Sequence, residues 1–286
     1  CYFYIYILII IRVNKLVINF TPTGMVPTKE MNPFVPIHEN EIIEEVVREN
    51  EKGITLVHLH ARDEKGLPTY KTHVYQKIVE GIRKYCPKLV ICISTSGRNF
   101  NELDKRSMAL ELRPDMGSLT LSSLNFNRQA SVNDPEMIKG LLDRMAMHGV
   151  NPELEVFDLG MINYAHYLIG KGWIQAPYYF NILLGNIAGM QPDLMSMAAA
   201  TQSLPQRSLW AFGGIGHHQL TANTVAMATG GGVRVGLEDN LYFANDKTFA
   251  SNETLLNRVR ELAKLLGREI MKPEEFGQMG FYNKYS

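Results

Sequence analysis

Two histidines separated by a single residue, His58 and His60, have the clearest capacity for chemistry in this chain. They follow an apolar, β-branched run at residues 54–57, which is typical of a buried strand. Because successive side chains of a strand alternate between its faces, both imidazoles are expected on one face and close together. Such a pair can bind one metal ion, although a hydrogen-bonded structural pair gives the same pattern.

A carboxylate far along the chain can complete a metal site. Glu238 follows a second strand-like run at residues 233–237. Two histidines and one carboxylate are a common catalytic zinc set, and they leave one coordination position open for a substrate. The same ligands bind other divalent metals, so zinc is a preference. A metal held there would polarise a carbonyl or enolate oxygen as a Lewis acid.

Asp239, which directly follows Glu238, is predicted to be a general base near the metal. Arg234 is close enough in sequence to pair with Asp239, and a neighbouring positive charge favours the ionised carboxylate. The alternative is a structural Arg–Asp pair that closes the barrel seam.

The elements that must position these residues are short β-branched runs that alternate with amphipathic runs. Strands are predicted at residues 16–19, 54–60, 89–94, 117–121, 153–157, 178–184, 208–212 and 233–237. Helices are predicted at residues 39–50, 74–85, 103–112, 134–149, 162–169, 193–201, 222–228 and 253–266. The helix at 134–149 has a clear start, with Asp134 as N-cap and Pro135 at the first helical position.

Eight strand–helix units predict an α/β fold, a TIM (β/α)8 barrel in a single domain. The length of 286 residues suits a barrel of about 250 residues. A doubly wound open sheet is the alternative, weakened because no Gly-x-Gly-x-x-Gly follows the first strand. The barrel domain is expected at 14–286, preceded by a leader of uncertain origin at 1–13. That leader lacks the features of a signal peptide and is too short to span a membrane.

Composition narrows the classes of function. The chain has 45% hydrophobic and 20% charged residues, as in ordinary globular proteins. Its 29 basic and 29 acidic residues give no electrostatic reason to expect nucleic acid or an anionic membrane as a partner. Three cysteines without a paired motif favour a reducing, cytoplasmic location.

In such a barrel the C-terminal strand ends form the active-site face. Hydroxyl groups and loop N–H groups gather there and suit a small carboxylate; they belong to Ser94, Gly97, Ser118 and Thr120. Arg98 could add a charge-assisted contact to a carboxylate or be a solvated arginine at the rim. His217 and His218 are expected at the rim on a glycine-rich loop, and Cys92 is expected to be buried.

Several motifs together resemble the β-keto acid cleavage enzymes. They are Thr-Gly at 23–24, His-Leu-His at 58–60, Ile-Ser-Thr-x-Gly at 93–97, Ser-Leu-Asn-Phe at 123–126, Glu-Val-Phe-Asp at 155–158 and Arg-Val-Gly-Leu-Glu-Asp-Asn at 234–240. The resemblance runs in order from about residue 16 to residue 273, which is nearly the whole chain.

The resemblance implies a zinc-dependent barrel that condenses a β-keto acid with acetyl-CoA, giving acetoacetate and a new acyl-CoA. It places His58, His60 and Glu238 as zinc ligands and Asp239 as the base, with Arg234 and Glu155 in its charged network. It places Ser94, Gly97, Ser118 and Thr120 at the keto-acid carboxylate. A homo-oligomer, a tetramer by resemblance, is also expected.

One position departs from the family pattern. The type member has a glutamate, suited to a substrate amino group, where this chain has Val26. An apolar residue cannot pair with an ammonium, so an amino-substituted β-keto acid is expected to be a poor substrate. A site formed by Met25, Val26 and Arg98 would suit an apolar or anionic tail.

Three other functions remain open at this point. A zinc hydrolase would use a metal-bound water as nucleophile and would not require an acyl-CoA. A class II aldolase-like lyase would bind phosphate at the seventh and eighth strands, where glycine-rich loops leave it open. A non-catalytic barrel would keep the metal only for structure.

Overall fold

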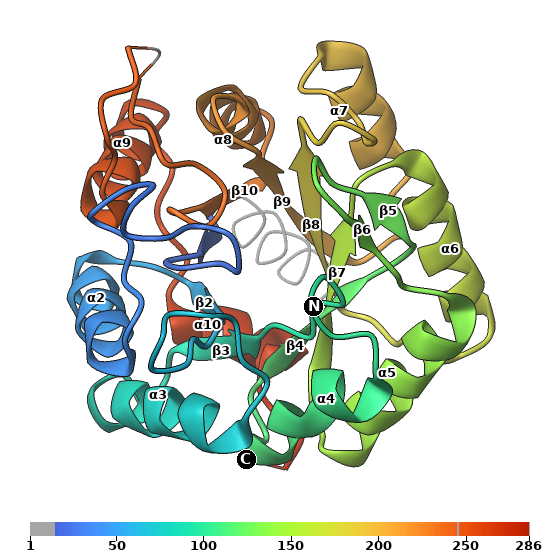
Figure 1. Ribbon diagram of the computed structural model, residues 1–286. Coiled ribbons are helices and arrows are strands. Elements are labelled where there is room, and N and C mark those ends of the chain that lie inside the picture. Colours follow the sequence, from blue (N-terminus) through green and yellow to red (C-terminus); the bar gives the residue numbers. More distant parts are fainter. Residues whose placement is uncertain (1–14, 245, 286) are drawn as a thin grey trace.

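The computed structural model describes residues 15–244 and 246–285, and these form a closed barrel of parallel strands surrounded by helices (Figure 1). The strands follow the order β1-β10-β9-β8-β7-β4-β3-β2 around the barrel. The predicted TIM-barrel class and single domain are therefore confirmed. The leader predicted at 1–13 lies outside the described residues.

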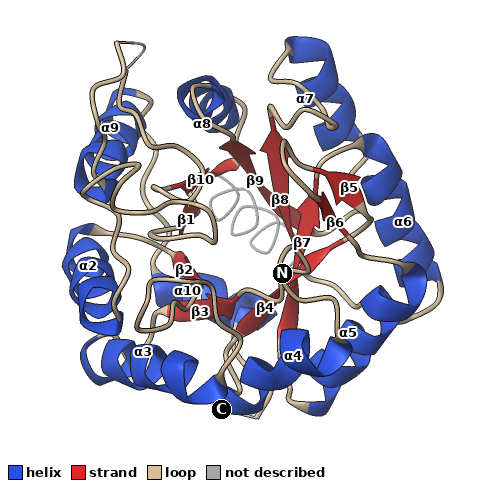
Figure 2. Ribbon diagram, in the orientation of Figure 1, coloured by secondary structure: helices blue, strands red, loops and turns tan. Residues whose placement is uncertain are grey.

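The strands and helices alternate along the chain, so the helices form an outer ring around the strands (Figure 2). The barrel strands are β1 (Ile18–Phe20), β2 (Leu56–Leu59), β3 (Val90–Ile93), β4 (Met116–Thr120), β7 (Asn151–Val156), β8 (Tyr178–Leu184), β9 (Ser208–Gly214) and β10 (Gly232–Val235). The surrounding helices are α2 (Glu39–Lys52), α3 (Thr72–Tyr85), α4 (Leu103–Ser107), α5 (Pro135–Met147), α6 (Leu159–Gly170), α7 (Leu194–Gln202), α8 (His218–Ala228) and α9 (Asn252–Leu265).

Strand β3 is a continuous apolar run because helices cover its outer face and the barrel interior covers the other. Every residue of β2 and β3 is buried. On α3, Ile78 and Ile82 form the stripe that packs on the strands. The predicted start of α5 is confirmed, since the Asp134 side chain accepts a hydrogen bond from the Met137 backbone N–H and Pro135 occupies the first turn.

The elements that differ from the prediction are short or lie at helix ends. The helix predicted at 103–112 is divided into α4 and the 3-10 helix η1 (Met108–Leu112). At the junction the Ser107 hydroxyl donates to the Leu103 carbonyl group, a bond that bends helices. Helix α8 begins at His218, four residues before the predicted start, so His218 lies in a helix and not in a loop.

Two pairs of elements were not predicted. A hairpin of β5 (Leu124–Asn125) and β6 (Ala130–Ser131) follows β4. The helical segments α10 (Pro273–Phe276) and η2 (Gly277–Phe281) lie near the C-terminus. Segments of two to five residues have too few positions to display a hydrophobic period, so pattern analysis does not detect them.

The segment α10–η2 closes the N-terminal end of the barrel, which we call the base. The rings of Phe276 and Phe281 stack at 4.2 Å, and Phe276 meets the edge of Tyr179 at 5.3 Å. These residues form one apolar cluster with the first residues of several strands, such as Leu56 and Val90. No helix in the described part of the chain is long and apolar enough to cross a membrane.

Candidate active site

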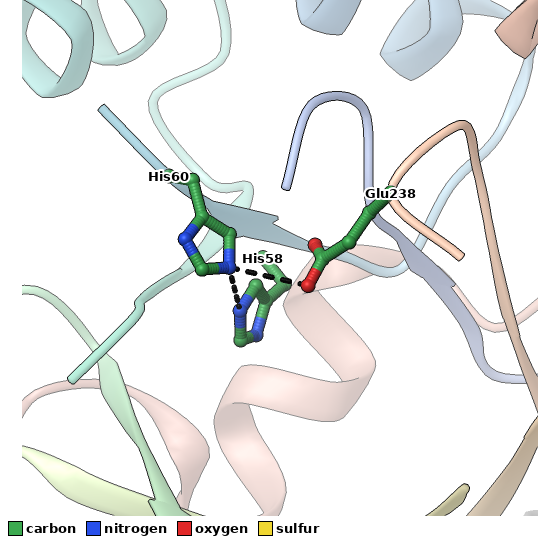
Figure 3. Close-up of side chains that lie close together, drawn as sticks. All are labelled: His58, His60 and Glu238. Atoms are coloured by element: carbon green, nitrogen blue, oxygen red, sulfur yellow. Dashed lines mark hydrogen bonds and ion pairs between the residues drawn. The ribbon is translucent and has the colours of Figure 1, made fainter. Parts of the chain in front are cut away.

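Three side chains from opposite ends of the sequence meet at the C-terminal ends of the strands, which we call the mouth (Figure 3). His58 Nε2 lies 3.2 Å from His60 Nε2, and His60 Nε2 lies 3.1 Å from Glu238 Oε1. Both histidines are buried, and the Glu238 side chain is 14% exposed. The prediction that both imidazoles share one face of the strand is confirmed.

Two glycines allow the Glu238 loop to approach the end of β1. Gly24 has a φ of +70°, and a Cβ there would lie 2.5 Å from Glu238 Cγ. Gly236 has a φ of +155°, and a Cβ there would lie 2.1 Å from the Thr21 carbonyl oxygen. Both positions therefore require glycine. The backbone bond from Glu238 N–H to the Thr21 carbonyl then fixes the loop beside β1.

The hydrogen-bonding capacity of these atoms favours a cation between them. His60 Nε2 carries either one hydrogen or one lone pair, so it cannot both accept from His58 and bond to Glu238 in a single tautomer. Glu238 Oε2 is buried without a hydrogen-bond partner among the described residues. Ligands about 2.0–2.1 Å from a tetrahedral zinc ion lie about 3.3 Å from one another. The separations of 3.2 and 3.1 Å match that spacing, so these residues fit a divalent metal.

Electrostatics prepares two of the three groups to bind a cation. Burial opposes the charged form of Glu238, but Arg234 and both histidines outweigh it and hold the pKa of Glu238 well below its ordinary value. Burial lowers the pKa of His60 to about 4, which leaves its ring neutral. In the metal-free protein the negative charges of Glu153 and Glu238 overcome burial and raise the pKa of His58 to about 9.

Glu153 on β7 contacts the proposed metal ligand His58 and was not among the residues predicted from the sequence. Its Oε2 lies 2.6 Å from His58 Nδ1, and its Oε1 accepts a hydrogen bond of 2.6 Å from Asn19 Nδ2. A carboxylate on Nδ1 orients the ring so that Nε2 faces the other ligands. The spacing Glu153-x-Glu155 could have indicated this role. Residues two apart on a strand have side chains on the same face, which here is the inward one.

Cys92 is buried, as predicted, and its thiol lies 3.2 Å from Glu153 Oε2. His58, Cys92 and Glu153 form a second cluster of potential ligands. Burial raises the pKa of the Cys92 thiol well above its ordinary value, so the thiol stays protonated and donates to the carboxylate. This second cluster therefore fits a support for His58 better than a metal site.

Arg234 on β10 connects the remaining acidic groups of the mouth. Its Nε donates to Asp239 Oδ2 at 2.9 Å and its Nη2 donates to Glu238 Oε1 at 2.7 Å. Its Nη1 lies 3.5 Å from Glu155 Oε1. The Arg234 side chain is 2% exposed, so one fully buried cation holds three carboxylates together. The expected pairing of Arg234 with Asp239 is confirmed.

The pKa of Asp239 moves in the direction opposite to the sequence-based expectation. Burial raises it, Arg234 lowers it, and the nearby charge of Glu238 raises it again, so the net shift is upward. The pKa of Glu155 is raised as well, chiefly by burial. The neighbouring arginine alone would lower the pKa of Asp239, but burial outweighs it. A raised pKa strengthens Asp239 as a proton acceptor.

The predicted carboxylate-binding groups lie on β4 and on the loop after β3, but several already have protein partners. Thr120 Oγ1 donates its only hydrogen to Glu155 at 2.8 Å, and Ser118 Oγ accepts from the Thr95 N–H at 3.1 Å. Ser94 Oγ accepts from a backbone N–H at 3.2 Å and keeps its hydrogen. A Cβ on Gly97 would lie 2.5 Å from an Arg106 nitrogen, so this position serves close packing.

The remaining predicted residues follow the C-terminal ends of strands at the mouth. Val26 is 50% exposed on the loop after β1, and its neighbour Met25 lines a cavity that His60 and Ser94 also line. Arg98 packs on the ring of Phe126. His217 is exposed and His218 is partly buried, with ring centroids 3.8 Å apart. Neither belongs to a ligand cluster within the described part of the chain.

A barrel with ionisable residues gathered at the C-terminal strand ends is typical of TIM-barrel enzymes. The family model for the beta-keto acid cleavage enzyme matches residues 15–279. The chain therefore belongs to this family, as its motifs predicted. It is 38% identical over 269 residues to a 3-keto-5-aminohexanoate cleavage enzyme of Fusobacterium nucleatum subsp. nucleatum, covering 93% of this chain and 97% of that protein.

A second relative differs in the substrate that its name states. It is a 3-oxoadipate:acetyl-CoA acetyltransferase of Cupriavidus necator, 34% identical over 89% of this chain and 90% of its own length. Both names are those of enzymes, and the acetyltransferase agrees with the predicted enzyme class. Among solved structures, the apo form of ObcA superposes with a TM-score of 0.75 at 20% identity, over 88% of this chain and 66% of that one, and supports the fold.

Proposed function

We propose that the protein cleaves a β-keto acid by exchanging acyl groups with acetyl-CoA, in a reaction that depends on a divalent metal, with zinc preferred. The products are acetoacetate and a new acyl-CoA. The observation that carries the proposal is the meeting of His58, His60 and Glu238 at the spacing of metal ligands, directly beside Asp239. Both full-length relatives reported above have names that agree with cleavage or acyl transfer of β-keto acids.

The proposed ligands would hold the metal through the two Nε2 atoms and the Glu238 carboxylate. When bound, the metal would supply Lewis-acid polarisation of the keto oxygen. Glu153 would keep His58 in the tautomer that presents Nε2 to the site, through the bond at Nδ1. Since Arg234 contacts both Glu238 and Asp239, the proposed base lies close to the proposed metal ligands.

Asp239 would remove a proton from the carbon between the ketone and the carboxylate. That carbon then forms a bond to the carbonyl carbon of acetyl-CoA, and coenzyme A leaves as its thiolate. The thiolate then attacks the carbon of the original ketone, and the bond between that carbon and the central carbon breaks. The acyl group leaves as the new acyl-CoA, and the acetoacetate enolate takes the proton back from Asp239. Arg234 would hold Asp239 in place by its bond of 2.9 Å and limit the repulsion between the neighbouring carboxylates.

The substrate tail is proposed to be apolar or anionic, and not cationic, because Val26 stands where the type member of the family has a glutamate. We expect 3-keto-5-aminohexanoate to be cleaved far more slowly than an uncharged analogue of the same length. Replacing Val26 by Glu should raise activity on the amino substrate relative to that analogue. Equal rates on both substrates with the unaltered protein would contradict this proposal.

The test of the function is a panel of β-keto acids incubated with acetyl-CoA, with acetoacetate as the measured product. We expect acetoacetate to form only when both substrates are present, and treatment with a chelator to abolish it. A zinc hydrolase would instead form product without acyl-CoA. A non-catalytic barrel would lose thermal stability when the metal is removed, and it would turn over none of the acids.

The aldolase alternative receives less support than it did from the sequence. The triplet Gly230–Gly232 leads into β10, whose first residue is Gly232, and it therefore lies at the end of the barrel opposite the mouth. A Cβ on Gly231 would lie 2.2 Å from the Trp210 ring, so this glycine serves packing. The cytoplasmic location and the tetramer remain predictions, and the free thiols of Cys86 and Cys92 are consistent with a reducing compartment.

A further inference from the structure

The arginines at the mouth differ in what their guanidinium groups bind. Arg62 donates to three backbone carbonyl groups of the neighbouring loops. Arg106 donates to two carbonyl groups and to the Asn133 side chain. Arg234 binds three carboxylates. Protein groups therefore engage the charge of each of these three cations, and only Arg234 Nη1 lacks a hydrogen-bond partner among the described residues.

Arg98 differs from all three. Its Cζ lies 3.6 Å from the centroid of the Phe126 ring, and within residues 15–244 and 246–285 no carboxylate lies within ion-pair distance of it. Its Nε is buried and has no hydrogen-bond partner in the same ranges. A guanidinium that stacks on a ring keeps its N–H edges directed outward in the plane, where they can bind a carboxylate.

The platform under Arg98 is rigid, so the guanidinium is held in place before a ligand binds. Phe126 meets the buried Phe157 edge to face, with ring centroids 5.7 Å apart. The Arg98 backbone is bonded on both sides, by its N–H to Ser96 Oγ and by its carbonyl oxygen to Gln129 Nε2. Such preorganisation reduces the entropy lost on binding.

Arg98 also lies within electrostatic reach of the catalytic carboxylates. Burial lowers the pKa of Arg98, and the charges of Glu238, Glu155 and Asp239 act in the opposite direction. Among the groups expected to hold a carboxylate, Thr120 has no hydrogen left to donate. Ser94 and Ser118 act only as acceptors in the hydrogen bonds above and keep a hydrogen to donate. A positively charged donor beside them would strengthen the binding of a carboxylate.

We propose that Arg98, stacked on Phe126, is the residue that binds a carboxylate of the acid substrate. This inference rests on the proposed function and adds the group that recognises the acid. The carboxylate has two potential sources. It is either the one that every β-keto acid carries beside its ketone, or a second one at the end of the tail of a dicarboxylic β-keto acid.

The experiment compares Arg98→Gln and Arg98→Lys with the unaltered metal-loaded protein. We expect the KM for the β-keto acid to rise by about 10- to 100-fold in Arg98→Gln, because a hydrogen bond to a charged group contributes about 1.5–3 kcal/mol. Arg98→Lys keeps the charge but loses the planar pair of donors. Its KM for the β-keto acid should therefore lie between that of the unaltered protein and that of Arg98→Gln. The KM for acetyl-CoA should stay unchanged.

Arg258→Gln is the matched control. Arg258 on α9 also stacks on a ring, with its Cζ 4.6 Å from the Phe243 centroid, and burial alone lowers its pKa. It therefore has the same kind of contact without the influence of the catalytic carboxylates. We expect this variant to keep the original KM for both substrates.

Two acids distinguish the source of the carboxylate. An equal rise in KM for a monocarboxylic and a dicarboxylic β-keto acid assigns Arg98 to the shared carboxylate. A rise for the dicarboxylic acid alone assigns it to the tail. An unchanged KM for both acids in Arg98→Gln, or a rise for acetyl-CoA only, would overturn the proposal.

Calorimetry of acid binding without acetyl-CoA separates this proposal from the proposed function. If the unaltered protein binds the acid but does not turn it over, the function has failed, and the effect of Arg98→Gln on affinity still tests the arginine. If turnover occurs and neither affinity nor KM depends on Arg98, only the present inference has failed.

Discussion

The two ends of the barrel interior are built from opposite chemistry. At the base, Phe276 and Phe281 stack face to face within an apolar cluster that includes Met271. At the mouth, the same set of strands ends in buried charges, with Arg234 in contact with carboxylates on two sides of the barrel. Burial of apolar rings stabilises a fold directly, whereas burial of charges costs free energy that pairing recovers only in part.

This difference indicates what each end is for. Aromatic packing at the base contributes stability. At the mouth, Asp239 and Glu155 have raised pKa values, and Glu238 Oε2 is buried without a partner among the described residues. Groups that are perturbed in this way gather at functional sites. Variants at the mouth should therefore change chemistry more than stability, and variants at the base should do the reverse.

The largest effect is expected for the proposed third metal ligand. Glu238→Gln removes the negative charge between His60 and Arg234, so the protein should lose its bound metal. Acetoacetate formation should fall by about 10³-fold or more, because Lewis-acid polarisation contributes several kcal/mol. Metal content by elemental analysis and turnover are measured together. A variant with full metal content and full activity would show that Glu238 is not a ligand.

A smaller loss is expected for the base. Asp239→Asn should reduce kcat by about 10²- to 10⁴-fold, since a positioned base typically contributes that much. Metal content should remain that of the unaltered protein, which distinguishes this variant from Glu238→Gln. If Asp239→Asn retains most of its turnover, another residue removes the proton.

A loss in metal affinity is expected for the residue that orients His58. Glu153→Gln weakens the contact of 2.6 Å to Nδ1, so metal affinity should fall by about 10- to 100-fold. Glu155→Gln is the control, because Glu155 lies two residues further on the same strand and contacts Thr120 and Arg234, not His58. Competition with a chromophoric chelator measures both variants. If Glu153→Gln and Glu155→Gln bind the metal with equal affinity, Glu153 does not support the metal site.

A change of pH should alter metal affinity less than these substitutions alter turnover or metal content. In the metal-free protein His58 has a pKa of about 9, whereas His60 at about 4 and Glu238 well below its usual range carry no proton at neutral pH. Metal binding at pH 7–8 should therefore release about one proton, from His58. Apparent affinity should rise by about tenfold for each pH unit up to about pH 9 and then level off. Calorimetry in buffers of different ionisation enthalpy measures the release, and zero or two protons would contradict this assignment.

The smallest effect on catalysis is expected at the base. Phe276→Ala should cost about 3–5 kcal/mol of the free energy of unfolding and leave kcat and metal content unchanged. The control is Phe249→Ala, because Phe249 is 44% exposed and contributes little burial. Thermal melts and turnover are measured on the same samples. Loss of metal in Phe276→Ala would mean that the two ends are not independent.

The sequence predicted the barrel and the meeting of its strand ends because both depend on periodicity, which local sequence carries. The rule that placed His58 and His60 on one face would also have paired Glu153 with Glu155, so Glu153 was within reach of the sequence. The stacking of Arg98 on Phe126 could not be predicted from the sequence, because Phe126 lies in the hairpin that was not predicted. The direction of the Asp239 pKa depends on burial, which a pair of neighbouring residues does not reveal.

The central claim is that one divalent metal lies between His58, His60 and Glu238. Crystals of the metal-loaded protein, measured on both sides of the zinc absorption edge, test it most directly. We predict one anomalous peak within about 2.0–2.2 Å of both Nε2 atoms and a Glu238 oxygen. A peak elsewhere, or full activity in crystals and solutions that hold no metal, would contradict the claim.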